Sequence, residues 1–231
     1  MTSDERCEIL DSYSTLRVAD VRDGMDTFLM HGRGSMSPDV RPLWRTIACG
    51  IAKTARYVPY EGEIPKLDPD EYWKWVGTYY RDICSYPWAG EIQDGDFVVI
   101  DMSGLNVGLM GSNNTLDCVK LGARGFVTGG GVRDTDEIII QKVPFWSTFI
   151  AQPMVQGRIA YDAHDIPVTV GGVEVHPGDV VVADGDGVIV VPRDRAMDVA
   201  EHARTVHRDD MEGRRKKYEA LGMAPDETLE E

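Results

Sequence analysis

The feature that most constrains the fold is an alternation of helix, strand, glycine and helix between residues 115 and 140. Residues 115–122 have helical character, and Gly-Phe-Val-Thr at 125–128 fits a short buried strand. Three glycines at 129–131 separate this strand from a helix expected to begin at about residue 134. This order is typical of α/β proteins, in which a parallel strand feeds the next helix. Ligands of such sheets bind beyond the carboxyl ends of the strands, so the glycines mark a candidate site.

Two other segments echo each other and predict equivalent strands of one sheet. They are IQDGDFVVIDMSG at 92–104 and VHPGDVVVADGDG at 175–187. Each contains a Gly-Asp turn and a run of β-branched residues, as expected of a buried strand bounded by turns. Asp101 and Asp184 end these strands, and we expect their carboxylates to accept backbone N–H groups in turns.

Further elements follow from periodicity. Residues 46–58 predict one strand or two short ones, and Asp20 is expected to cap an early helix. A helix is expected at 70–84, whose aromatic stripe indicates core or a subunit interface. A charged amphipathic helix or helix pair is expected over about the last 35 residues. The stripe of the helix at 70–84 comprises Tyr72, Trp75, Val76, Tyr79 and Ile83.

The composition of the chain limits the kinds of partner and the cellular compartment that we expect. The net charge of -15 disfavours contact with nucleic-acid phosphates and with anionic membranes. No apolar run of about 18 residues occurs, and the charged first residues do not resemble a signal peptide, so we expect a soluble cytoplasmic protein. The four cysteines form no CxxC pair and are expected to be reduced thiols in the core.

The glycine run and the residues after it allow three interpretations. A phosphate loop is disfavoured, because no lysine follows the glycines and the pattern GxGxxG is absent. The run is otherwise a tight turn of positive-φ glycines, in which Asp134 and Glu137 form a helix capping box. In the third interpretation Arg133 binds a substrate carboxylate and Asp134 binds a divalent cation.

Other patterns of catalytic or metal-binding residues are weak. The five histidines form no HxxH or HExxH pattern, so the spacing does not favour zinc. His164, between Asp162 and Asp165, is expected to be a loop residue. No GxSxG elbow is present, which disfavours a serine hydrolase.

Four segments together resemble the RraA-like proteins. The segment LGARGFVTGGGVRDTDE resembles the family signature G-x-x-G-x-V-x-D-G-x-x-R-D-x-x-E/D. The other three are ADVRDGMD, SPDVRPLWRTIACGIAKTA and VGGVEVHPGDVVVADGDGVIVVP, so the similarity covers roughly residues 15–195. The family includes the class II aldolases of 4-hydroxy-4-methyl-2-oxoglutarate and 4-carboxy-4-hydroxy-2-oxoadipate.

The resemblance implies an α/β fold, an RraA-like α/β/β/α sandwich with a C-terminal charged helix. We expect residues 1–231 to form a single domain, with its core at about 15–195 and a helical extension at about 195–223. The family assembles as homotrimers or homohexamers, with active sites at subunit interfaces.

The resemblance also implies roles for individual residues. Arg133 would hold the carboxylate of a pyruvoyl group, and Asp134 would bind Mg²⁺, Mn²⁺ or another divalent cation. The backbone amides of Gly111, Ser112, Asn113 and Asn114 align with those that bind substrate in the family. An acidic residue of the C-terminal helix would reach in from the next subunit to orient water at the metal. Glu212 is the best match for that residue, with Asp209 and Asp210 as competitors.

The implied activity is that of a metal-dependent carbon–carbon lyase. Such an enzyme cleaves or decarboxylates a small 2-oxo acid through a pyruvate enolate, as an aldolase, an oxaloacetate decarboxylase or both. The alternatives are a non-catalytic RraA-like regulator that binds a ribonuclease, or a different reaction on the same scaffold. Departures from the family pattern leave the substrate open: Gly129 replaces an aspartate, and Ser112, Asn113 and Asn114 replace residues that are often acidic or leucine.

Overall fold

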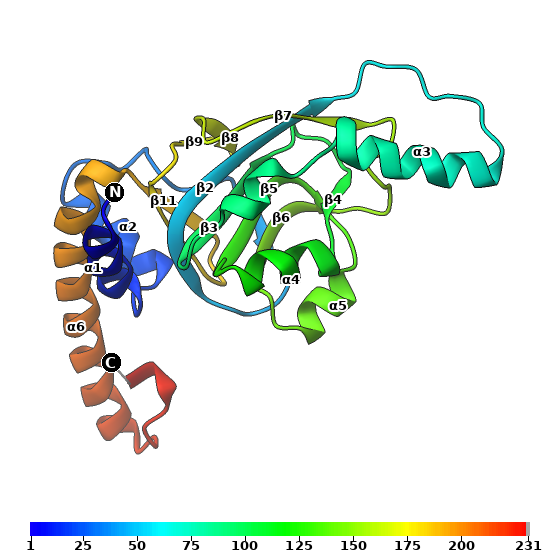
Figure 1. Ribbon diagram of the computed structural model, residues 1–231. Helices are drawn as coiled ribbons and strands as arrows, with labels where there is room; N and C mark the ends of the chain where they lie inside the picture. Colours follow the sequence, from blue (N-terminus) through cyan, green and yellow to red (C-terminus); the bar gives the residue numbers. More distant parts are fainter. Residues whose placement is uncertain (230–231) are drawn as a thin grey trace.

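A nine-stranded sheet of mixed parallel and antiparallel strands forms the centre of the protein. The computed structural model describes residues 1–229 (Figure 1). The strand order is β1-β6-β5-β3-β2-β10-β11, with β4 beside β5 and β7 beside β2, and β8 and β9 form a separate hairpin. The strands are β1 (Arg41–Pro42), β2 (Ala48–Pro59), β3 (Asp96–Asp101), β4 (Gly108–Met110), β5 (Gly125–Val132), β6 (Phe145–Ile150), β7 (Ile159–His164), β8 (Val168–Val170), β9 (Val173–Val175), β10 (Val180–Ala183) and β11 (Val188–Val191).

The helices form two groups on opposite sides of the sheet (Figure 1). One group, α1, α2 and α6, packs against β10, β11 and the start of β2. In the other group α4 and α5 lie over β3, β5 and β6, and α3 packs through Tyr79 beside β7 and the end of β2. The helices are α1 (Ser3–Tyr13), α2 (Val18–Asp26), α3 (Pro69–Asp82), α4 (Ser112–Lys120), α5 (Thr135–Ile140) and α6 (Ala196–Leu221), and the 3-10 helices are η1 (Pro87–Glu91), η2 (Arg193–Arg195) and η3 (Glu227–Leu229).

The sheet is curled, so its two halves face each other across an inner core. Alternation along β3 illustrates this: Phe97 and Val99 point into the inner core, and Val98 and Ile100 point toward the outer helices. Val181 of β10 also lies in the inner core, whereas Val182 packs toward the other helical group. The layers therefore run helix, sheet, sheet, helix, and the α/β/β/α prediction is confirmed, with one curled sheet supplying both inner layers.

Strand β2 is a single strand of 12 residues that pairs with strands of both halves of the sheet. Of the two predictions for residues 46–58, one strand is therefore correct and two short strands are wrong. It pairs with β3 in parallel and with β10 and β7 in antiparallel orientation. The echoed segments become β3 and β10, so their prediction as strands of one sheet is confirmed, although they run in opposite directions. The carboxylates at the ends of these strands accept backbone N–H groups in turns, as predicted: Asp101 accepts the N–H of Ser103 at 2.8 Å, and Asp184 accepts that of Asp186 at 2.7 Å.

The glycine run is not a loop. Residues 129–131 continue β5, and the register against β6 shifts between Thr128 and Gly131. None of the three glycines has a positive φ, so the expected turn is wrong. Packing requires two of them instead: a Cβ on Gly130 would lie 2.7 Å from the Cβ of Met102, and one on Gly131 would lie 2.5 Å from that of Ala151.

Several smaller expectations are corrected. Asp20 lies inside α2 rather than at its cap, although its carboxylate accepts the Arg17 N–H at 2.9 Å. Cys84 and Cys118 are buried as expected, Cys49 is half-buried and Cys7 is exposed. In the stripe Val76 and Tyr79 are buried, Tyr72, Trp75 and Ile83 are half-buried, and Trp75, Tyr79 and Ile83 pack in the core of this side of the sheet. Within residues 1–229, the structure contains no helix with the length and apolarity needed to span a bilayer.

Candidate functional site

The candidate site lies where two neighbouring parallel strands end and two helices begin. Strand β4 pairs with the end of β5, with Gly108 opposite Gly131 and Met110 opposite Val132. Strand β4 then leads through Gly111 into α4, and β5 leads through Arg133 and Asp134 into α5. The two connections therefore meet at one edge of the sheet, as the sequence predicts for a ligand site.

Arg133 and Asp134 lie against the β4–α4 connection. The Arg133 Nε donates to Asp134 Oδ1 at 3.2 Å, and the Ser112 N–H donates to Asp134 Oδ2 at 3.3 Å. Both side chains remain about one-third exposed, at 33% and 37%. These long hydrogen bonds leave carboxylate lone pairs and guanidinium N–H groups available for a ligand.

Two glycines outside the signature make this arrangement possible. A Cβ on Gly111 would lie 2.3 Å from Asp134 Oδ2, and one on Gly108 would lie 2.7 Å from the Arg133 side chain. Any larger residue at either position would displace the group beside it. The close approach of backbone to the two candidate side chains therefore depends on Gly108 and Gly111, whereas Gly130 and Gly131 serve packing behind the site.

The capping-box interpretation of Asp134 is wrong. Asp134 is the N-cap residue of α5, but its side chain makes no capping hydrogen bond and turns toward Ser112 instead. Its backbone is left-handed, with φ of 56°, a conformation that costs a non-glycine residue about 1–3 kcal/mol and often occurs at functional sites. The carboxylate is thus directed out of its own helix and into the space between the two connections.

The predicted substrate-binding residues occupy the start of α4. Gly111 is the N-cap and supplies no side-chain cap, and Ser112, Asn113 and Asn114 form the first turn. The Ser112 N–H donates to Asp134, and the N–H groups that follow it in the first turn, with the positive end of the helix dipole, favour an anion. Tyr86 contacts the residue before this turn, because its hydroxyl donates to the Leu109 carbonyl at 2.9 Å.

The three acidic candidates on the C-terminal helix lie far from Arg133 and Asp134 in the folded chain. Helix α6 packs on α1 and α2, on the side of the molecule opposite α4 and α5 (Figure 1). Glu212 is exposed there, and Lys216, 2.7 Å away, lowers the pKa of its carboxyl. Asp210 pairs with Arg17, and Asp209 is exposed. Within one chain none of them joins Arg133 and Asp134, so their predicted role depends on a second copy.

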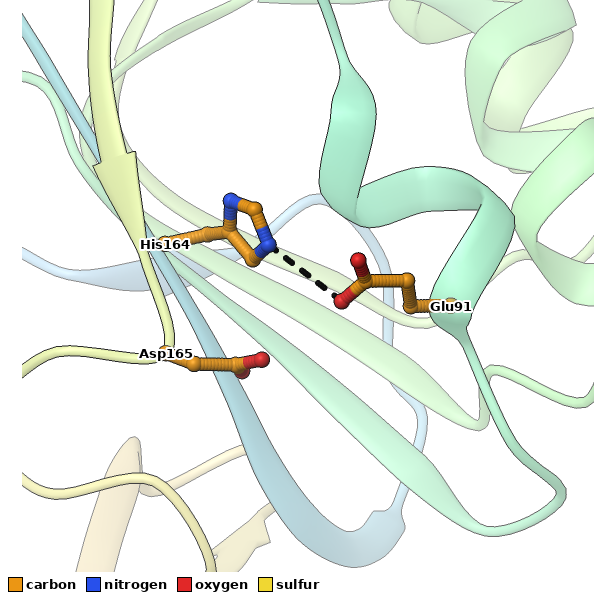
Figure 2. Close-up of side chains that lie close together, drawn as sticks. All are labelled: Glu91, His164 and Asp165. Atoms are coloured by element: carbon orange, nitrogen blue, oxygen red, sulfur yellow. Dashed lines mark ion pairs between the residues drawn. The ribbon is translucent and has the colours of Figure 1, made fainter.

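A second group of polar side chains was not predicted from the sequence. Glu91, His164 and Asp165 place their donor atoms within 4.8 Å of one another, close enough to share a metal ion (Figure 2). His164 is the last residue of β7 and is half-buried, so its expected position in a loop is wrong. Glu91 lies 73 residues away in the sequence, which is why spacing alone gave no signal.

A cavity of about 690 Å³ lies apart from both groups. It is bounded by the loop after α2, the β8–β9 hairpin and the segment before α6, and it contains none of the predicted site residues. Arginine and acidic side chains line it together, so it shows no preference for one sign of charge. Its lining includes Arg33, Arg193, Glu5, Glu174 and Asp194.

Comparison with known proteins relates this chain to one family. The family model described as RraA-like, Aldolase/RraA, matches residues 15–190. A 4-hydroxy-4-methyl-2-oxoglutarate aldolase of Thermus thermophilus is 34% identical over 100 residues, which cover 42% of this chain and 60% of that protein. Protein DlpA of Legionella pneumophila is 26% identical over 199 residues, which cover 85% of this chain and 29% of DlpA. The chain thus spans less than two thirds of the length of these curated relatives.

A solved structure supports the fold over nearly the whole chain. RraAS2 of Streptomyces coelicolor, described as an unusual member of the RNase ES inhibitor RraA protein family, superposes with a TM-score of 0.71. The two chains are 25% identical, and the superposition covers 90% of this chain and 96% of RraAS2. Relatives of this chain therefore include both proteins named as aldolases and a member of a ribonuclease-inhibitor family.

Proposed function

Because the chain belongs to the RraA-like family, we propose that it is a divalent-metal-dependent lyase acting on a small 2-oxo acid. The observation that carries this proposal is the junction of the β4–α4 and β5–α5 connections. There a guanidinium, a carboxylate and the N-terminal end of α4 meet at the carboxyl edge of parallel strands. Such a set can bind an anionic substrate and a hard cation at adjacent positions.

The residues present fit a Mg²⁺ or Mn²⁺ ion held largely by its substrate and by water. Mg²⁺ in proteins commonly uses one or two carboxylates and keeps several waters, and Asp134 supplies one exposed carboxylate. The long hydrogen bonds from Arg133 and Ser112 orient this carboxylate without consuming its lone pairs. When bound, the cation supplies Lewis-acid stabilisation of the negative charge that develops on the keto oxygen.

The chain's own residues then bind and orient the substrate. The Arg133 guanidinium presents a planar fork that matches a carboxylate, and it fixes the end of the pyruvoyl unit. The first-turn amides of Asn113 and Asn114 lie at the positive end of α4, where they favour a second anionic or carbonyl oxygen. Their side-chain amides add neutral hydrogen-bonding groups, which favour a polar leaving portion. The bond broken is the one between C3 and C4 of the 2-oxo acid, so C1 to C3 remain as pyruvate and the rest leaves as a carbonyl compound or as CO2.

The test is pyruvate release from 4-hydroxy-4-methyl-2-oxoglutarate and from oxaloacetate, measured with Mg²⁺ and with EDTA. We expect turnover that requires the metal and is lost in Asp134→Asn, with Mg²⁺ affinity measured by calorimetry lost in parallel. Asp136→Asn is the matched control, because Asp136 is an exposed carboxylate two residues further on in α5. Absence of metal-dependent turnover on both substrates, or equal effects of the two substitutions, would contradict the proposal.

A second candidate is a regulator that binds a ribonuclease, as the description of the RraAS2 family suggests. The net charge of -15 is compatible with a basic partner segment. This candidate predicts that Asp134→Asn leaves partner binding unchanged. Inhibition of a ribonuclease E-type enzyme that persists in Asp134→Asn, combined with no lyase activity in the wild type, would favour it over the lyase.

A further inference from the structure

A second cluster of charged side chains lies away from the Arg133–Asp134 site, at the seam between the two helical layers. Lys53 is its centre: it points outward from β2 between Ile51, which packs with the α1, α2 and α6 layer, and Ala55, which packs with the other layer. Only 8% of Lys53 is exposed. Its Nζ donates to Glu91 Oε2 and to Asp165 Oδ2, each at 2.8 Å.

His164 completes the cluster from the end of β7. Its Nε2 lies 3.2 Å from Glu91 Oε2, and Figure 2 shows the ring and the two carboxylates converging on one space. Two carboxylates face one ammonium there, so the cluster keeps one excess negative charge when the imidazole is neutral. The hydrogen bonds and charge of Lys53 lower the pKa of Glu91, so this carboxyl stays ionised.

The supporting contacts hold each group in place. The Tyr161 hydroxyl hydrogen-bonds to His164 Nδ1, and the Tyr161 ring packs edge-on against the buried Tyr57, 5.6 Å away. This contact directs Nε2 toward the carboxylates, as the outer partner of a metal-binding histidine does. Asp165 has a left-handed backbone, and its N–H donates to the Thr54 carbonyl at 3.0 Å. His164 is therefore held by a strand and Glu91 by a short helix, and Asp165 lies in the bend that follows β7.

We propose that this cluster is an exchangeable cation site, at which a divalent transition-metal ion such as Zn²⁺ binds Glu91, His164 and Asp165 in place of the Lys53 ammonium. One imidazole nitrogen and two carboxylates suit Zn²⁺ and similar ions. Glu91 and Asp165 are exposed, so an ion can enter from solvent. Binding at Nε2 requires the tautomer with its proton on Nδ1, which then donates to the Tyr161 oxygen.

The role of Lys53 separates this site from an ordinary ion-pair network. The ammonium occupies the space between the carboxylates and competes with the metal, so removing it strengthens metal binding. If the cluster is only an ion-pair network, removing Lys53 leaves two unpaired carboxylates and creates no preference for a metal that depends on His164. The site uses none of the residues of the proposed lyase, so its test stands apart from that function.

The experiment is a calorimetric Zn²⁺ titration of chelator-treated protein in an Asp134→Ala background, which removes the other candidate metal ligand. We expect tighter Zn²⁺ binding in Lys53→Met than in the parent and a Zn²⁺-dependent rise in its Tm. Both gains should disappear in Lys53→Met/His164→Gln. Tyr161→Phe should weaken binding by about tenfold, as loss of an outer partner typically does.

Two further outcomes keep the test decisive if Lys53→Met folds poorly. His164→Gln and Glu91→Gln, each made with Lys53 retained, should remove one Zn²⁺ equivalent from the parent isotherm. Zn²⁺ binding that survives both changes would mark an adventitious ion elsewhere and overturn the proposal. A parent isotherm with no step that depends on His164 would overturn it as well.

Discussion

The glycine run provides the most direct test of the packing argument, because adjacent glycines face different surroundings. A Cβ on Gly130 would lie 2.7 Å from the Cβ and Sδ of Met102 and 2.8 Å from the Leu105 carbonyl oxygen. Ordinary carbon contacts are about 3.5–4.0 Å, so the overlap approaches 1 Å, and the carbonyl oxygen is backbone that moves only with the chain. By contrast, a Cβ on Gly129 would meet its nearest atom, in Val170, at 3.8 Å.

We therefore expect Gly130→Ala to lower the free energy of unfolding by about 1–3 kcal/mol, the usual cost of overpacking a core. Gly129→Ala should be neutral or stabilising by about 0.4–1 kcal/mol, because its backbone does not require glycine. In a chain of this size the first change corresponds to a Tm lower by about 2–12 °C. Urea denaturation and calorimetry of the two variants measure the difference. Equal stabilities, or a larger loss at Gly129, would refute the packing explanation.

Two further predictions concern buried titratable groups. Burial raises the pKa of Asp20, but hydrogen bonds and charge from Arg17 outweigh it and lower that pKa below the ordinary 3.8. The Asp20 contribution to stability is therefore present above about pH 4 and is lost as the pH falls further. Asp20→Asn should cost about 1–3 kcal/mol near neutral pH, because Arg17 is one-third exposed and keeps Asp210 as a partner. The difference in the free energy of unfolding between wild type and Asp20→Asn should shrink in urea titrations at acid pH. A difference that is the same at pH 3 as at pH 7 would contradict the lowered pKa of Asp20. In a thiol-reagent assay Cys7 should react first, whereas Cys84 and Cys118, whose pKa burial raises to about 12, should react only on unfolding.

Local periodicity was sufficient to predict much of the fold. The stripe at 70–84 predicts α3 to within two residues at each end, because its spacing matches the helical repeat. The Gly-Asp turns with β-branched runs predict β3 and β10 for a similar reason. The direction in which the two strands run could not be predicted, since it depends on which strand lies between them.

The glycine run shows where local interpretation fails. Three successive glycines favour a turn, but the atoms that exclude a side chain at Gly130 and Gly131 belong to Met102 and Ala151, each at least 20 positions away. The same limit applies to the candidate site residues. Arg133 and Asp134 are adjacent in the sequence and were predicted, whereas the Glu91 cluster forms only when η1 approaches the end of β7.

The pairing of β2 has a consequence for synthesis of the chain. This strand ends at Pro59, but its partners include β7, which ends at His164, and β10, which ends at Ala183. At about 5–20 residues per second, roughly 6–25 s pass between synthesis of β2 and synthesis of its last partner. During that interval its apolar faces and one strand edge remain exposed on the nascent chain. Truncations that end before residue 183 leave part of that edge unpaired, and we expect them to aggregate.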